Sequence, residues 1–271
     1  MPHAPGSLNR VRRRLATLAA CFILLFAWPA HAQSPAPAPA TPDFFTRYDF
    51  HLNAKSLSGD DKGFAWDAQF GGDLDLVDYV KGRASVLVDY ETVLGSRLRP
   101  FDPEQAYYVL ETSASYRQRY AELAFVFHHV SRHLSDRAKD FSIAYNVMSA
   151  RALRRIEVGG VTIDARADVG KVIQHSYVDY SWTADSNLVI RRSVNPRLGV
   201  FVHGYGEMFG VDGTLPNRET QTGGLVEAGV RINGRAGAIE LFAGIERRVD
   251  ADPIERLSKR WGIWGFRLLS K

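Results

Sequence analysis

The chain has 271 residues, with 34 Lys and Arg against 30 Asp and Glu, and a single Cys at position 21. Four of the arginines and none of the acidic residues lie in the first 32 positions, so 30 residues of each sign remain after them. A chain that is neutral beyond its leader has no electrostatic basis for binding nucleic acid, and one Cys excludes a disulfide framework.

The first 32 residues are typical of a secretory signal peptide. A basic stretch, Arg10–Arg14, precedes a short apolar core, Leu15–Trp28, and Pro29–Ala32 ends in a small-x-small cleavage pattern. The core is too short for a membrane-spanning helix. A lipoprotein box ending at Cys21 is the alternative, but the apolar core continues well past that residue. We expect a signal peptide at 1–32, a Pro/Ala-rich linker at 33–43 and export across the inner membrane of a Gram-negative bacterium.

From residue 44 onward the chain alternates apolar and polar residues with the period of a β-strand. Each alternating stretch is near the ten-residue length of a tilted strand that spans a bilayer. The predicted strands cover residues 49–55, 64–76, 83–91, 108–117, 119–133, 141–158, 161–169, 188–194, 198–209, 225–233, 236–248 and 261–269. The pattern predicts an all-β fold over 44–271, a transmembrane antiparallel up-and-down β-barrel of about twelve strands.

The connections between the predicted strands alternate in length. Tight turns are expected at 79–82, 116–118, 159–160, 195–196 and 233–234, and longer polar loops at 95–105, 211–223 and 250–259. Outer-membrane barrels pair short periplasmic turns with longer outer loops, which favours a periplasmic N-terminus and localisation in the outer membrane. A soluble secreted β-sandwich or soluble barrel is the alternative, because alternation alone does not say which face meets lipid.

The charged face of the predicted strands would line the barrel interior. Its mixture of signs favours internal ion pairs, with a narrow, porin-like aqueous pore as the alternative. Neither one dominant sign nor a ladder of aromatic residues, which are typical of a substrate-specific pore, is evident in the pattern. The expected interior residues are Asp67, Asp73, Asp75, Arg83, Asp89, Glu91, Glu111, Arg117, Glu122, Arg166, Asp168, Glu227, Arg231, Glu240, Glu246 and Arg267.

The stretch 119–133 differs from the other predicted strands. One face carries, in order, Ala121, Leu123, Phe125, Phe127, His129, Ser131 and His133. The other face carries Glu122, Ala124, Val126, His128 and Arg132. If the apolar face meets lipid, Ala121 to Ser131 climbs roughly 24 Å, so the three polar residues lie near the outer leaflet. Polar side chains facing lipid are costly, which makes them candidates for a functional site.

A serine flanked by histidines on one strand face suggests nucleophilic acyl transfer. The hydroxyl needs an adjacent base, and a histidine two positions away projects from the same face. Asn146, on the next strand, would lie beside His129 if the hairpin closes around Asp136 to Ala138. A register slip of one residue would turn Asn146 inward. His133 is the weaker alternative base.

The segment Phe127 to Ser131, with Asn146 on the next strand, resembles the His-x-Ser plus Asn arrangement of outer-membrane phospholipase A, a twelve-stranded, calcium-activated barrel. Lipid A 3-O-deacylase barrels also carry a His-x-Ser on an outward-facing strand. The resemblance implies that Ser131 is the nucleophile, His129 the general base and Asn146 the orienting group. It also implies hydrolysis of acyl esters in outer-leaflet phospholipid or lipid A.

Several positions depart from these families. The phospholipase follows its serine with Asn-Gly-Arg, whereas this chain has Arg132-His133-Leu134, and no Glu occupies the deacylase-like position. A Ca²⁺ ion is therefore expected only from the resemblance, with Asp136 and Asp140 as weak ligand candidates. The chain is also similar to uncharacterised outer-membrane barrels that share a His-x-Ser-x-His-x-x-Asp pattern.

An ordinary structural role is the alternative for each of these polar residues, because His and Ser are common at the level of lipid headgroups. Metal binding by His128, His129 and His133 is disfavoured, since His128 belongs to the other strand face. Three functions remain open: a serine lipid hydrolase, a pore or transport protein, and a structural or adhesion barrel. The expected partners are outer-membrane phospholipid and lipopolysaccharide and the barrel-assembly machinery, with the protein as a monomer or a homodimer.

Overall fold

The computed structural model describes residues 38–270, so the predicted signal peptide and the first part of the linker lie outside the described residues. Thirteen strands and no helix are found in the described part. Their bounds are β1 Asp43–Phe44, β2 Tyr48–Leu57, β3 Trp66–Asp78, β4 Arg83–Gly95, β5 Asp102–Arg117, β6 Glu122–Leu134, β7 Ile143–Val158, β8 Val161–Ser176, β9 Tyr180–Ser193, β10 Leu198–Val211, β11 Gln221–Asn233, β12 Gly237–Asp252 and β13 Leu257–Ser270. Within residues 38–270, no helix is long and apolar enough to cross a membrane.

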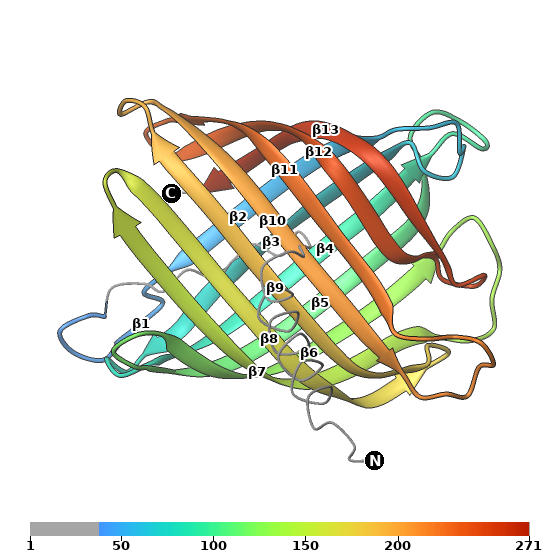
Figure 1. Ribbon diagram of the computed structural model, residues 1–271, viewed down its shortest axis with the longest axis horizontal. Helices are drawn as coiled ribbons and strands as arrows, with labels where there is room; N and C mark the ends of the chain where they lie inside the picture. Colours follow the sequence, from blue (N-terminus) through green and yellow to red (C-terminus); the bar gives the residue numbers. More distant parts are fainter. Residues whose placement is uncertain (1–37, 271) are drawn as a thin grey trace, which may run out of the picture.

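Strands β2 to β13 form a closed antiparallel barrel (Figure 1). Each strand pairs with the next along the chain, and β13 returns to pair with β2, with Arg267 opposite Asn53. The short strand β1 pairs only with the end of β3, where Phe44 lies opposite Val77. Closure leaves each barrel strand with two neighbours, which satisfies the backbone hydrogen bonds in a bilayer. The predicted twelve-stranded up-and-down barrel is confirmed.

The two faces of the barrel wall follow the alternation in the sequence. On β6, Leu123 and Phe125 point outward and are 47 % and 58 % exposed, whereas Glu122 and Val126 are buried inside. Large apolar residues such as Trp264 are exposed in the same way around the wall. A soluble barrel would place its apolar face inside, so the arrangement excludes that alternative. The fold is that of an outer-membrane barrel.

One end of the barrel carries tight turns and the other carries most of the longer loops. The turns lie at 79–82, 118–121, 159–160, 194–197 and 234–236, and the opposite loops at 58–65, 96–101, 135–142, 177–179, 212–220 and 253–256. The last outer loop is shorter than predicted, because β12 extends to Asp252 and β13 begins at Leu257. The predicted strands at 161–169 and 188–194 were also too short, because polar interior residues such as Asp185 interrupt the apolar pattern.

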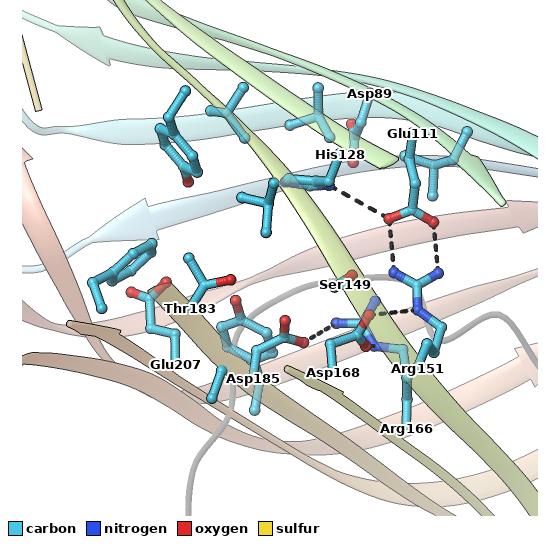
Figure 2. A pocket seen from close by; sticks show the side chains of 18 of the residues that line it. Asp89, Glu111, His128, Ser149, Arg151, Arg166, Asp168, Thr183, Asp185 and Glu207 are labelled. Carbon is cyan, nitrogen blue, oxygen red and sulfur yellow. Dashed lines mark hydrogen bonds and ion pairs between the residues drawn. The ribbon is translucent and has the colours of Figure 1, made fainter. Parts of the chain in front are cut away.

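Ion pairs cross-link the barrel interior. Arg151 of β7 donates to Glu111 of β5 at 2.5 and 2.7 Å and to Asp168 of β8 at 2.7 Å (Figure 2). Arg267 joins Glu227 and Glu240 at 2.7 and 2.8 Å. All sixteen charged residues predicted for the interior are buried or half-buried. The prediction of an interior cross-linked by ion pairs is confirmed.

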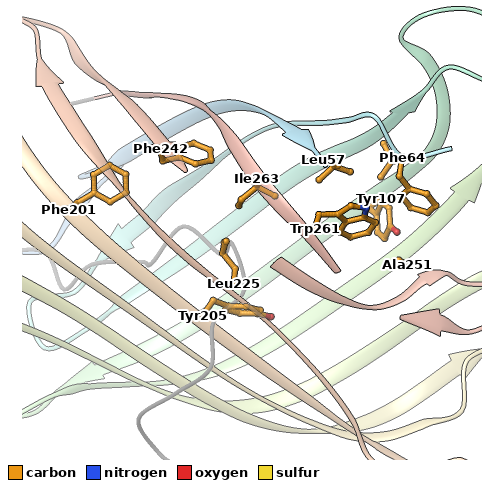
Figure 3. Close-up of a cluster of buried hydrophobic side chains, with 11 residues drawn as sticks. Leu57, Phe64, Tyr107, Phe201, Tyr205, Leu225, Phe242, Ala251, Trp261 and Ile263 are labelled. Carbon is orange, nitrogen blue, oxygen red and sulfur yellow. The ribbon is translucent and has the colours of Figure 1, made fainter. Parts of the chain in front are cut away.

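Part of β12 bends inward at the outer end of the barrel. The β12–β13 register shifts between Arg248 and Asp252, and the intervening residues turn into the lumen. Ala251 is fully buried in a cluster with Trp261 and Phe64 (Figure 3). Val249 belongs to a second buried cluster. We call Val249–Asp252 the plug segment.

Aromatic rings also occupy the interior, although no ladder of aromatic residues is evident in the sequence pattern. Tyr180 and Phe209 stack at 4.4 Å between ring centroids, and Tyr145 meets Tyr180 edge-on at 5.5 Å. The sequence pattern does not predict that these rings lie inside, because their strands carry apolar residues on both faces and alternation does not mark the inward side.

Candidate functional site

The register of the β6–β7 hairpin places Asn146 on the outer surface beside His129. His129 lies directly opposite Asn146, and Ser131 lies opposite Ala144. The next outward pair along the hairpin is apolar, with Phe127 opposite Met148, which is 40 % exposed. The predicted register is confirmed, and the hairpin closes through residues 135–142 at the outer end.

A chain of hydrogen bonds orients the imidazole of His129. Its Nδ1 lies 2.6 Å from Asn146 Oδ1, and Asn146 Nδ2 donates to Gln174 Oε1 at 2.9 Å. Because the amide nitrogen of Asn146 faces Gln174, its oxygen faces the imidazole, and an amide oxygen can only accept. Nδ1 of His129 therefore carries the proton, which leaves the lone pair on Nε2. This is the tautomer that a general base requires.

A β-bulge brings Gln174 to this position. Asn146 pairs with Gln174 and Val147 pairs with Val172, so Ile173 is an extra residue in β8. If the same residues paired regularly, without a bulge, Ile173 would lie opposite Asn146 and Gln174 would turn inward. Sequence reasoning missed Gln174, because the bulge breaks the two-residue period and the predicted strand ended at Val169.

Ser131 lies on the same outward face, between His129 and His133 along β6. It is half-buried, with Tyr108 of β5 directly opposite. Alternate residues of a strand are about 7 Å apart at Cα, so adjacent side chains on one face meet through rotamer changes. Within residues 38–270, no hydrogen bond joins Ser131 to His129 in this conformation. Catalytic hydrogen bonds commonly tighten only when substrate is bound.

His133 has a different environment. Its ring packs edge-on against Tyr108, with 5.1 Å between centroids. Tyr108 continues a row of outward rings through Tyr90 and Phe70, at 5.0 and 5.2 Å. Such rows are typical of the lipid interface of barrels. The amide-oriented histidine is therefore His129, and His133 is the weaker candidate base.

The other candidate residues lie elsewhere. His128 points into the barrel, with its Nδ1 3.4 Å from Glu111 Oε2, so it shares no face with His129. Asp136 is almost fully buried and pairs with Arg97 at 2.8 Å and with Arg137 at 3.2 Å. A carboxylate already paired with two guanidinium groups does not fit a calcium ligand.

Asp140 lies in the 135–142 loop, and its exposed carboxylate belongs to no metal-ligand group. The described part of the chain contains no group of three or more His, Cys, Asp or Glu arranged to hold a metal.

Comparisons with known proteins report similarity of fold. No protein-family model matches the chain, and no curated protein matches its sequence. Among solved structures, LpxR from Salmonella typhimurium, a lipid A 3-O-deacylase, is 9 % identical, with a TM-score of 0.49, over 82 % of this chain and 99 % of that one. The outer membrane protein Omp33 of Acinetobacter baumannii is 12 % identical, with a TM-score of 0.39, over 83 % and 97 %.

The translocator domain of the autotransporter NalP from Neisseria meningitidis is also similar, at 10 % identity and a TM-score of 0.37, over 97 % of this chain and 94 % of that one. Similarity this distant says nothing about catalysis, and the chain is placed with outer-membrane barrels by its own closed sheet and apolar outer face.

Proposed function

We propose that this outer-membrane barrel is a serine hydrolase that cleaves acyl esters of outer-leaflet lipid. Ser131 is the nucleophile, His129 the general base and Asn146 the group that orients the imidazole. The observation that carries the proposal is the 2.6 Å hydrogen bond between His129 Nδ1 and Asn146 Oδ1 on the lipid-facing surface, with Ser131 two residues along the same face. A hydrogen-bonded pair of this kind facing lipid has no evident structural purpose.

The reaction proceeds through an acyl-serine. Ser131 Oγ attacks the ester carbonyl carbon while its proton passes to His129 Nε2. The bond between the carbonyl carbon and the alcohol oxygen then breaks, and the alcohol leaves with that proton. His129 next takes a proton from water as the water oxygen attacks the acyl-serine. The fatty acid leaves, and the proton returns to Ser131.

The position of the site favours a substrate that reaches it laterally from the membrane. The three residues lie in the outer half of β6 and β7, next to the outward apolar side chains Phe127 and Met148. Acyl-chain esters of phospholipid and of the lipid A part of lipopolysaccharide lie at this level of the outer leaflet. The proposal includes export by the N-terminal signal peptide and insertion by the barrel-assembly machinery.

The test is ester hydrolysis by refolded mature protein on phospholipid and on lipid A, each with calcium and with a chelator. We expect Ser131→Ala and His129→Ala to lower turnover by at least about 10³-fold, because either change removes the nucleophile–base pair. Ser135→Ala, in the exposed loop beyond β6, is the matched control and keeps full activity. Heat-modifiable migration on gels reports that each barrel is folded. Folded wild-type protein without turnover on either lipid would refute the hydrolase.

A further inference from the structure

The barrel interior contains a cavity of about 120 Å³, inward from the proposed lipid site. Valine and tyrosine side chains form part of its wall, including Val109, Val147 and Tyr205. Figure 2 shows His128 and Glu111 on one side of the cavity and Glu207 and Thr183 on another. The plug segment adjoins it, because Glu207 accepts the backbone N–H of Val249.

Glu207 is the unusual member of the cavity wall. It is only 3 % exposed, and its Oε2 has no hydrogen-bond partner. No ion pair joins it to a Lys, Arg or His of residues 38–270. An isolated negative charge is costly at such a buried site, so the carboxyl group is neutral while the cavity is empty, and a cation bound beside Oε2 would hold it ionised.

The other carboxylates around the cavity have partners within the protein. Glu111 and Asp168 bind Arg151, and Asp185 pairs with Arg166. Glu91 is paired with Arg248, and Asp89 accepts from Gln69. The wall thus presents six carboxylates, and three guanidinium groups, those of Arg151, Arg166 and Arg248, pair with four of them. This surplus of negative charge favours a cationic occupant at Glu207.

We propose that this cavity binds a short alkylammonium ion. Its ammonium group would donate to Glu207 Oε2, and its alkyl chain would lie on the valines. Tyrosine rings favour a cation at their faces as well. The volume limits the alkyl chain, because a dry cavity of about 150 Å³ accepts benzene and this one is smaller. The proposal is independent of the lipid hydrolase, since none of Ser131, His129 or Asn146 lines the cavity.

The test uses n-propylammonium, with n-propanol as the neutral probe of the same shape. Mature protein is refolded in detergent with each probe present, which removes any barrier to entry, and the midpoint of thermal unfolding is measured. We expect n-propylammonium to raise the midpoint and n-propanol to leave it unchanged. Glu207→Gln keeps an acceptor for Val249 but lacks the charge, so it should weaken binding at least about tenfold. Glu219→Gln, in the exposed loop after β10, should bind like wild type.

A second variant keeps the test decisive if Glu207→Gln folds poorly. Val147→Leu narrows the cavity and retains the carboxylate, so it should also weaken binding of n-propylammonium. Equal stabilisation by n-propanol would overturn the proposal, because the site would then recognise shape alone. It is also overturned if n-propylammonium leaves the midpoint of wild-type protein unchanged, or stabilises Glu207→Gln as much as wild type.

Discussion

At the scale of single residues, the candidate site depends on the direction in which two amide groups point. Asn146 Oδ1 accepts the hydrogen bond from His129 Nδ1 only while Asn146 Nδ2 donates to Gln174. If the Asn146 amide turned over, two donors would face each other and the imidazole would lose its orientation. Gln174 is therefore a positioning residue, which acts on the reaction through Asn146 and contacts no reacting atom.

This role gives a prediction that rests on the proposed hydrolase. Gln174→Met removes the acceptor for Asn146 Nδ2 at similar volume, and we expect kcat to fall about tenfold with KM little changed. Gln174→Glu restores an acceptor oxygen and should recover most of the rate. Steady-state kinetics on a soluble short-chain ester measure both variants. A loss of the same size in both would mean that Gln174 serves only the packing of β8.

At the scale of elements, the β-bulge in β8 sets which residue meets Asn146. Pairing of β8 with β9 ends at Lys171 opposite Trp182, so the residues beyond the bulge pair only with β7. The extra residue Ile173 therefore has no paired residue in β7 or in β9. Its effect is local to the candidate site.

Deleting Ile173 should therefore leave the barrel folded. Gln174 would follow Val172 directly and still lie opposite Asn146, because the existing pairs on either side of the bulge are retained. Val169, by contrast, pairs regularly with both neighbouring strands. Deleting it would turn the side chains between position 169 and the bulge to the opposite face of the barrel wall. Heat-modifiable gel migration and ester turnover compare the two deletions. Loss of heat-modifiable migration in the Ile173 deletion would show that the barrel itself requires the bulge.

At the scale of the whole molecule, the plug segment bends into the lumen at the outer end of the barrel. Asp250 accepts from Tyr180 Oη and from Arg218 Nη2, both at 2.5 Å, and Arg218 also binds Asp179 at 2.8 Å. The loop after β10 is thereby joined to the 177–179 loop before β9 and to β12. These contacts weigh against the alternative of a passive pore.

Planar bilayer recordings test this closure. We expect wild-type protein to show no steady conductance at neutral pH, because the plug segment and the interior ion pairs fill the lumen. Replacing Val249–Asp252 by four glycines removes the buried side chains of the plug and should give measurable current. Arg218→Ala should give brief openings by releasing Asp250. A large steady current through wild-type protein would favour the pore and contradict the plug.

The sequence by itself determined the class of fold and which side chains of each strand point into the barrel or out of it. Period-two alternation is a property of neighbouring residues, so it assigned the paired interior charges and placed His129, Ser131 and His133 outward without knowledge of any partner strand. The tight turns likewise follow from local residue types. For these reasons the barrel and the outward serine and histidine were predictable.

Only the tertiary structure decided which side chains meet between strands. The pairing of His129 with Asn146 depended on a register that one residue could reverse, and Gln174 reached the site through a bulge that alternation does not encode. The plug segment and the unpaired oxygen of Glu207 depend on side chains that meet across the lumen. Such contacts join residues far apart in the chain, so no local pattern determines them, and closure of the sheet brings them together.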